Sequence, residues 1–257
     1  METVTAIKEK LKAANQWEPW MDELAQDSRK SIQTLIAQWH KRQNSNAKLL
    51  HNHEKKIQFD QSYKKHPTSL VAGIDEAGRG PLAGPVVTAA VILPEDCTML
   101  IGLDDSKKLS KAKRNYFADM IREVAVSYAV HIQPPVEIDR CNIYQATRLS
   151  MTKAALQLNS PPAIVLADAM MLDLPMPCES IIKGDAKSLA IAAASILAKT
   201  TRDKLMDSYA DEFPGYGFDK HAGYGTPEHL EALRNLGPCP IHRKTFEPIK
   251  SLLMKTL

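Results

Sequence analysis

Two adjacent carboxylates and a glycine-rich turn lie within one short segment of the sequence, Gly73–Pro85. Asp75 and Glu76 follow an apolar run, and carboxylate oxygens are the ligands that hard cations such as Mg²⁺ prefer. Arg79 stands between two glycines, which let the backbone approach a ligand closely. The segment therefore combines residues that can bind a metal ion with residues that can meet a phosphate.

Two further aspartates stand at the ends of expected strands. Asp168 closes an apolar run, and Asp185 lies where an expected strand passes into an expected helix. Taken alone, each is explained by a turn or by a helix N-cap. With Asp75 and Glu76, these aspartates make four negative charges beside apolar strands. Unpaired charges in such a place are unfavourable, and a divalent cation would relieve their repulsion. The pattern predicts an oxygen-only site for Mg²⁺ or Mn²⁺.

The helix expected over 186–210 carries a line of polar residues that starts near Asp185. Ser188, Ser195 and Arg202 recur at intervals of seven, opposite a face of small apolar residues. An amphipathic helix packed through its alanines explains this pattern. Because the line begins at the predicted metal site, it can also follow a phosphate backbone.

Two loops carry further candidates for ligand binding. The segment Asp105–Ser110 precedes a basic helix, for which Ser110 is a suitable N-cap and a solvated basic face is the simplest explanation. The loop 215–227 is rich in glycine and aromatic residues, and Tyr224 on it can stack on a base or a sugar. Packing of Tyr224 over a helix start explains the same spacing.

The composition is typical of a globular protein with a sizeable core. Of 257 residues, 44% are hydrophobic and 25% are charged, and the net charge of +3 is too small to indicate a nucleic-acid partner. No apolar run approaches the roughly 20 residues that span a bilayer, and the N-terminus lacks the apolar segment of a secretory signal. The four scattered cysteines disfavour a zinc site or a disulfide framework. We expect a cytoplasmic protein with no membrane partner.

Residues 1–66 differ in composition from residues 67–257. They contain no Gly and one Pro, and residues 1–70 hold 12 Lys or Arg against 8 Asp or Glu. The apolar spacing predicts helices near 4–14 and 31–40, followed by a basic, polar connector over 41–66. We therefore expect a small helical N-terminal extension ahead of the main domain.

The main domain, 67–257, is expected to be an α/β domain. A strand meander followed by strands that alternate with helices indicates a mixed five-stranded sheet flanked by helices, with a helical C-terminal part. The expected strands are 70–75, 85–93, 124–130, 163–168 and 180–183, and the expected helices are 110–123, 136–158 and 186–210.

Over residues 70–250 the chain resembles ribonuclease HII, a type 2 ribonuclease H from bacteria. Several separate motifs occur in the order that is typical of this family. They are Gly73–Gly80, Asp105–Leu109, Lys183–Asp185, Ala192–Lys199, Gly223–Thr226 and His242–Phe246.

The resemblance implies a ribonuclease H-like fold and a metal-dependent endonuclease, active as a monomer. Its expected partners are RNA/DNA hybrids, whose RNA strand it hydrolyses, and duplex DNA with embedded ribonucleotides, which it incises on their 5′ side. The products carry 5′-phosphate and 3′-hydroxyl ends, and the activity suits ribonucleotide excision repair. The expected cofactors are two Mn²⁺ or Mg²⁺ ions, about 4 Å apart in sites of this type.

The resemblance also implies roles for individual residues. The catalytic, metal-binding set is Asp75, Glu76, Asp168 and Asp185. The turn Gly78, Arg79 and Gly80 reads the ribose 2′-hydroxyl, Tyr224 senses the RNA–DNA junction, and phosphate contacts fall on Ser106, Lys107, Ser195 and Arg243.

The sequence departs from the family pattern at two places. Asp168 is followed by Ala169 and Met170, so it matches by strand context, and Asp173 is the fallback ligand. Ala222 stands where relatives often have Lys, which removes one expected phosphate contact.

Three other functions are weighed against this one. Ribonuclease HIII shares the fold and the reaction, but its fourth carboxylate is Glu and its extension is β-rich, whereas this chain has Asp185 and a helical pattern. A nucleotide-binding module requires Gly-x-Gly-x-x-Gly, which the turn at Gly78 does not match. The third alternative is a non-catalytic protein that binds hybrids.

Overall fold

The computed structural model describes residues 2–255, and its internal contacts divide the chain into two units, Met1–Glu54 and Lys55–Leu257. The division falls before residue 66, where composition places the boundary, because residues just after Glu54 pack with the second unit. No helix in the described range is both long enough and apolar enough to cross a lipid bilayer.

The first unit is helical, as the sequence predicts. Its elements are α1 (Val4–Ala13), α2 (Pro19–Ala25) and the N-terminal part of α3 (Lys30–Ser62). Thr3 caps α1 by accepting a hydrogen bond from the amide of Ala6. Trp39 is buried and donates its indole N–H to the carbonyl of Ala14 over 3.0 Å, which ties α3 to the end of α1.

The helix α3 is longer than the sequence pattern predicts. It runs without interruption to Ser62, through most of the stretch that we expected to be a basic, polar connector. Because residues 41–62 contain neither Gly nor Pro, nothing interrupts the helical hydrogen bonds, and residues such as Lys, Gln and Leu favour a helix. The basic, polar segment is therefore helical over 41–62, where its polar composition reflects the exposed side chains of a helix.

The second unit is built on the predicted mixed five-stranded sheet. Its strand order is β3-β2-β1-β4-β5, with β3, β2 and β1 antiparallel and with β1, β4 and β5 parallel. The strands are β1 (Val71–Ala77), β2 (Val86–Ile92), β3 (Ser127–Gln133), β4 (Ile164–Asp168) and β5 (Cys178–Ile181). The strand β3 begins later than predicted because the preceding helix extends to Val124.

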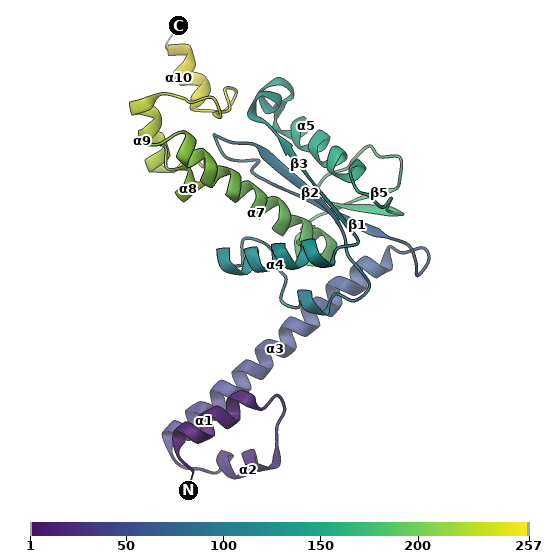
Figure 1. Cartoon of the computed structure of the whole chain (residues 1–257), viewed down its shortest axis with the longest axis vertical. Helices are drawn as coiled ribbons and strands as arrows, with labels where there is room; N and C mark the ends of the chain where they lie inside the picture. Colours follow the sequence, from purple (N-terminus) through teal and green to yellow (C-terminus); the bar gives the residue numbers. More distant parts are fainter. Residues whose placement is uncertain (1, 256–257) are drawn as a thin grey trace. The chain divides into compact units, whose positions relative to one another are not determined.

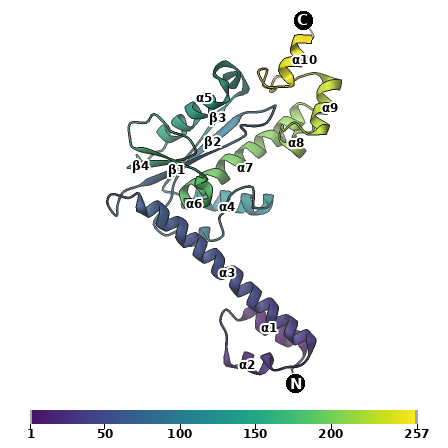
Figure 2. The ribbon, with the colours of Figure 1, turned by 180° about the vertical axis from the view of Figure 1, so that it is seen from behind.

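Helices cover both faces of the sheet (Figures 1 and 2), with α5 on one face and α4 and α7 on the other. The helices are α4 (Lys111–Val124), α5 (Pro135–Leu156), α6 (Gly184–Lys187), α7 (Leu189–Glu212), α8 (Phe218–His221), α9 (Pro227–Leu236) and α10 (Ile249–Lys255), with a 3₁₀ turn at Thr98–Leu100. Ser110 caps α4 as predicted, because its hydroxyl accepts the amide of Lys113.

The helix α7 packs unusually close to β1. A Cβ atom at Gly73 would lie 2.1 Å from the carbonyl carbon of Ala190, a distance at which the two backbones would collide. Glycine on the strand and small residues on the helix therefore allow the approach. Because Asp75 follows on the same strand, this packing sets its distance from α7.

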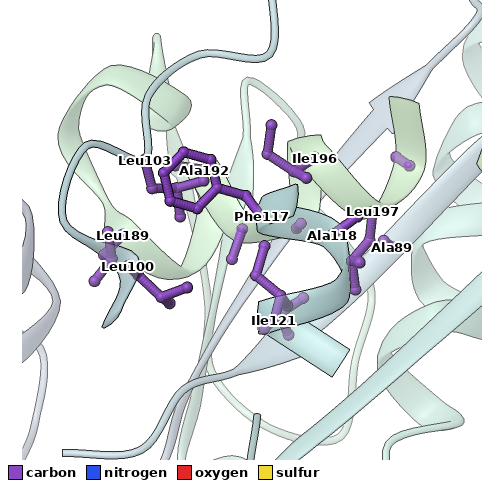
Figure 3. Close-up of a cluster of buried hydrophobic side chains, with 14 of the residues drawn as sticks. Ala89, Leu100, Leu103, Phe117, Ala118, Ile121, Leu189, Ala192, Ile196 and Leu197 are labelled. Atoms are coloured by element: carbon purple, nitrogen blue, oxygen red, sulfur yellow. The ribbon is translucent and has the colours of Figure 1, made fainter. Parts of the chain in front are cut away.

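A cluster of apolar side chains joins α4 and α7 to the sheet and to the loop that precedes α4 (Figure 3). Phe117 and Ile121 of α4 lie beside Ala192 and Ile196 of α7, and Leu103 packs on them from the loop that leads to Asp104. The cluster fixes the side of the sheet on which α7 approaches β1.

Replacing Phe117, which is buried, by alanine removes most of a ring from this cluster. We expect Phe117→Ala to lower the free energy of unfolding by roughly 3–5 kcal/mol, the usual cost of such a cavity. Tyr116→Ala on the exposed side of the same helix is the control and should change it by less than about 1 kcal/mol. Denaturant unfolding measures both, and equal effects would contradict the packing described.

Candidate active site

Two of the predicted carboxylates lie side by side on neighbouring parallel strands. The pairing of β1 with β4 ends at Ile74 and Ala167, so Asp75 and Asp168 occupy the next position on each strand. Because side chains alternate between the faces of a sheet, residues in register point to the same face. Glu76 follows on β1, and its amide donates to Asp75 Oδ1 over 2.7 Å.

A hydrogen bond ties the third carboxylate to the segment that carries the fourth. Asp168 Oδ1 accepts the amide of Gly184 over 2.7 Å, and Asp185 follows in the first turn of α6. Lys183, not Asp185, occupies the N-cap position of α6, and it has a left-handed φ of 55°. The helix-cap explanation of Asp185 is therefore wrong, and its side chain is free to face the cleft.

All four carboxylates line one cleft of the second unit, which has about 240 Å³ of free space. That volume is room for several water-sized molecules, each of which occupies about 30 Å³. Asp173, the fallback ligand, is exposed and is not among the described residues that line the cleft. The other predicted site residues on its walls are Gly78, Arg79, Gly80, Ser106, Lys107, Ser195 and Tyr224.

Three of the carboxylates, Asp75, Glu76 and Asp185, have pKa values that burial raises. Burial raises the pKa of Asp75 well above its ordinary value, and the charges of Glu76 and Asp168 raise it further. Burial also raises the pKa of Glu76, against the opposing charge of Arg79, and it raises that of Asp185. Like charges held close together in a water-poor site account for these shifts. Any cation that enters the cleft would favour the ionised forms.

The donor atoms of the cleft suit a hard divalent cation. Glu76 Oε2 is buried and has no hydrogen-bond partner among the described residues, which marks an oxygen with unused binding capacity. Carboxylate oxygens are the ligands that Mg²⁺ and Mn²⁺ favour. Across residues 2–255, however, no three Asp, Glu, His or Cys side chains are already gathered as a coordination group. The metal set of Asp75, Glu76, Asp168 and Asp185 therefore fits by chemistry and stays a prediction.

Two serines lie deep in the cleft rather than on its rim. Ser195 on α7 is hydrogen-bonded to Ser106 through their hydroxyl oxygens, which are 3.0 Å apart, and each serine is only 5% exposed. The Ser195 hydroxyl also lowers the pKa of Asp75, against the larger effect of burial. Lys107, the next residue along the loop, reaches the same cleft with its side chain. The two serines form the polar floor of the site, and Lys107 lies at its exposed edge.

Arg243 lies beneath the turn Gly78–Gly80 and not at the surface of the cleft. It is fully buried, and its guanidinium donates to the carbonyls of Gly78, Arg79 and Gly84. Burial lowers the pKa of Arg243 to about 9. The expected direct contact with a phosphate is therefore wrong, because no donor of Arg243 reaches the solvent. Arg243 positions the backbone of the turn instead.

Arg202 supports the same turn from α7, contrary to the idea of a polar line along a phosphate backbone. Its guanidinium donates to the carbonyls of Ala83, Pro85 and Ala222 over 3.0–3.1 Å. A Cβ atom at Gly78, where φ is 96°, would lie 2.0 Å from Arg202 Nε. Sequence spacing placed Arg202 on a polar face but gave no sign that carbonyl groups would surround it.

Tyr224 lines the cleft next to the turn Gly78–Gly80. Its side chain is 49% exposed, and its ring edge would lie 3.6 Å from a Cβ atom at Gly80. A buried chain of histidines supports its backbone. His242 is hydrogen-bonded to His229 over 3.0 Å, and His229 Nδ1 is 2.9 Å from the carbonyl of Tyr224. The sequence motif contained His242 but gave no reason to assign it this role.

Comparison with known proteins decides the family. A protein-family model described as Ribonuclease HII matches residues 72–249, and a second, described as Ribonuclease HII N-terminal domain, matches residues 3–64. The chain belongs to the ribonuclease HII family. It is 49% identical to the ribonuclease HII of Enterococcus faecalis, over 98% of this chain and 99% of that one. It is 46% identical to that of Bacillus subtilis, over 97% and 98%. The resemblance and the expected class, an endoribonuclease, are confirmed.

Solved structures show the same fold. The ribonuclease H2 of Pyrococcus horikoshii is 28% identical, with a TM-score of 0.64 over 72% of this chain and 98% of that one. A ribonuclease HIII crystallised with Mn²⁺ is 18% identical, with a TM-score of 0.55 over 73% and 70% of the two chains, and this match concerns the fold alone. The expected ribonuclease H-like fold of this ribonuclease HII is thus confirmed.

The histidines beneath Tyr224 make stability depend on pH. Burial, helped by His229, lowers the pKa of His242 to about 4. As pH falls below about 6.5, His242 is protonated in the unfolded chain but stays neutral in the folded one. The free energy of unfolding therefore declines until about pH 4, where folded His242 is protonated too. His242→Gln should flatten this decline by up to roughly 3 kcal/mol in unfolding experiments between these pH values. His66→Gln, at an exposed site, is the control, and an unchanged slope in His242→Gln would refute the assignment.

Proposed function

We propose that this ribonuclease HII hydrolyses the RNA strand of RNA/DNA hybrids and incises duplex DNA on the 5′ side of single embedded ribonucleotides. The observation that carries the proposal is one cleft lined by four carboxylates, a Gly-Arg-Gly turn and an exposed tyrosine. The products would have 5′-phosphate and 3′-hydroxyl ends. We further propose that the enzyme acts as a monomer in the cytoplasm, where the free thiols of its cysteines are the expected state.

Asp75, Glu76, Asp168 and Asp185 would hold Mg²⁺ or Mn²⁺ in this cleft. When bound, such ions activate a water molecule and offset negative charge on the reacting phosphate. The protein supplies the positions: Asp75 and Asp168 are fixed by the sheet, and Asp168 in turn binds the segment of Asp185. Arg79 holds Glu76 through a contact of 3.4 Å, and because the Arg79 side chain is 41% exposed, its guanidinium can turn to a phosphate instead.

Selectivity for ribose is expected from the turn Gly78–Gly80. Arg243 donates to the carbonyls of Gly78 and Arg79, so these carbonyl groups are already occupied. A ligand at the turn would therefore meet its amide groups. A 2′-hydroxyl is the group that distinguishes RNA from DNA locally. Tyr224 beside Gly80 offers an aromatic face for the adjoining sugar or base. Lys107, Ser106 and Ser195 are the proposed partners of the phosphates.

The N-terminal extension is proposed to strengthen substrate binding electrostatically. In this proposal, residues 1–66 form the extension and connector, and residues 67–257 form the catalytic domain. Lys41 and Lys48 are exposed on α3, seven residues apart and hence on one face, with Asn44 and Ser45 between them in a shallow groove. Cations and hydrogen-bond donors on one helical face suit a phosphate backbone.

Catalysis by Asp75 is tested with a DNA duplex that contains one ribonucleotide. Asp75→Asn should bind this duplex like the wild type but cleave it at least about 100-fold more slowly in Mg²⁺ or Mn²⁺, because it removes one of the charged oxygens of the site. Asp173→Asn is the matched control and should cleave normally. Retained cleavage by Asp75→Asn would refute the site, and wild-type cleavage restricted to runs of ribonucleotides would favour activity of the ribonuclease HIII type.

The electrostatic role of α3 is tested by removing two charges. The double variant Lys41→Gln, Lys48→Gln should bind the hybrid more weakly, and its slope of log affinity against log salt should fall by up to about 2. Its turnover at saturating substrate should not change. Lys8→Gln, Lys12→Gln removes the same charge from α1 and serves as the control. Equal salt slopes for both variants and the wild type would exclude contact by this face of α3.

A further inference from the structure

The last turns of α3 carry two ionisable residues that face the catalytic body. Lys56 and Asp60 are one helical turn apart and hence on the same side of the helix. Lys56 is only 5% exposed, whereas the neighbouring Lys55 is exposed to solvent. A buried lysine in a helix is costly, because its charge loses water. Its contacts therefore indicate what this position does.

The ammonium group of Lys56 connects two segments of the cleft. It donates to the carbonyl of Asp185 over 3.0 Å, to Asp104 Oδ1 over 3.2 Å and to the carbonyl of Leu103 over 3.4 Å. An ammonium group has three protons, and three acceptors surround this one. One contact fixes the backbone of a predicted metal ligand, and the others fix the loop that leads to Ser106.

Asp60 holds the other end of the segment that contains Asp185. It accepts the amide of Ala190 over 2.9 Å at the start of α7, and the hydroxyl of Ser188 also contributes a hydrogen bond to it. Ser188 in turn caps α7 by accepting the amide of Ile191 over 3.0 Å. The short helix α6, with Asp185, is thus held between a contact from Lys56 and one from Asp60.

Apolar contacts fix this part of α3 to the sheet. Phe59 and Tyr63 pack on a buried cluster that contains Leu166 of β4 and Ile191 of α7. Ile57 packs against the cluster shown in Figure 3. The end of α3 is therefore anchored independently of its polar groups, so that Lys56 and Asp60 act from a rigid support.

We infer that Lys56 is a positioning residue that sets the backbone of Asp185, and with it the metal-binding geometry of the cleft. The inference rests on the proposed role of Asp185. Stability alone does not explain Lys56, because its one carboxylate partner, Asp104, has a side chain that is 37% exposed. A pair with one exposed member adds little net stability, because the lost hydration of the buried lysine offsets the attraction. The last turns of α3 thus contribute to the geometry of the active site.

The test compares Lys56→Met with Lys55→Met in the full-length protein. Mn²⁺ alone is titrated calorimetrically into each variant, and kcat and KM are measured on the duplex with one ribonucleotide. Lys56→Met should bind Mn²⁺ and turn over about 10- to 100-fold less well, as is usual when a partner of a metal ligand is lost. Its KM should stay within about twofold of the wild type. Denaturant unfolding is measured alongside to show that each variant is folded. Lys55→Met should match the wild type throughout.

Wild-type Mn²⁺ affinity and kcat in folded Lys56→Met would overturn the inference. If Lys56→Met does not fold, Lys56→Arg decides, because a guanidinium keeps the charge but cannot place its protons at the same three acceptors. Reduced Mn²⁺ affinity in folded Lys56→Arg supports positioning, and unchanged affinity refutes it. If the wild type itself does not cleave the duplex, the proposed function fails, while the Mn²⁺ titrations still test Lys56.

Discussion

The structure depends on negative charge held where water is scarce. Asp75 lies at the junction of β1, β4 and α7 and is only 6% exposed, with Glu76 and Asp168 close enough to raise its pKa further. Such a group of carboxylates opposes folding unless a cation or a proton joins it. Glu76 Oε2, which is buried and has no hydrogen-bond partner within residues 2–255, marks where this need for a positive charge is unmet. The cleft is therefore prepared for a positively charged ligand.

The surrounding elements keep this unfavourable arrangement in place. Gly73 lets β1 approach α7 so closely that a methyl group would not fit. Two buried arginines, Arg202 and Arg243, bind backbone carbonyls of the segment after Asp75, so their charges shape the turn without neutralising the carboxylates. The rigidity of the scaffold thus holds the carboxylates close together, where their mutual repulsion would otherwise move them apart.

Much of this could be predicted from the sequence. Apolar runs that end in Asp located Asp75 and Asp168, because strand ends are where a sheet presents polar groups from fixed positions. Glu76 follows Asp75 directly, and the transition from strand to helix located Asp185. The five strands and the main helices were predicted with small errors at their ends; β3, for example, starts later because α4 uses the residues before it. Pairing of β1 with β4 also brought Asp168, rather than Asp173, to the cleft.

Other features could not be predicted, because they depend on which surfaces meet. An arginine in a motif looks like a phosphate ligand, and only the tertiary structure shows that carbonyl groups surround Arg243. In the same way, the polar stretch after residue 40 gave no sign that it forms one helix to Ser62 or that it contains a buried lysine, Lys56. Propensity and charge describe a residue's own preferences, whereas burial depends on residues far away in the chain.

The most direct test of the charge constraint is the free energy of unfolding with and without Mn²⁺, in the wild type and in Asp75→Asn. If buried repulsion is relieved by a cation, Asp75→Asn is more stable than the wild type without metal, and Mn²⁺ stabilises the wild type much more than the variant. A variant that is less stable without metal and gains as much from Mn²⁺ as the wild type would contradict this view of the site.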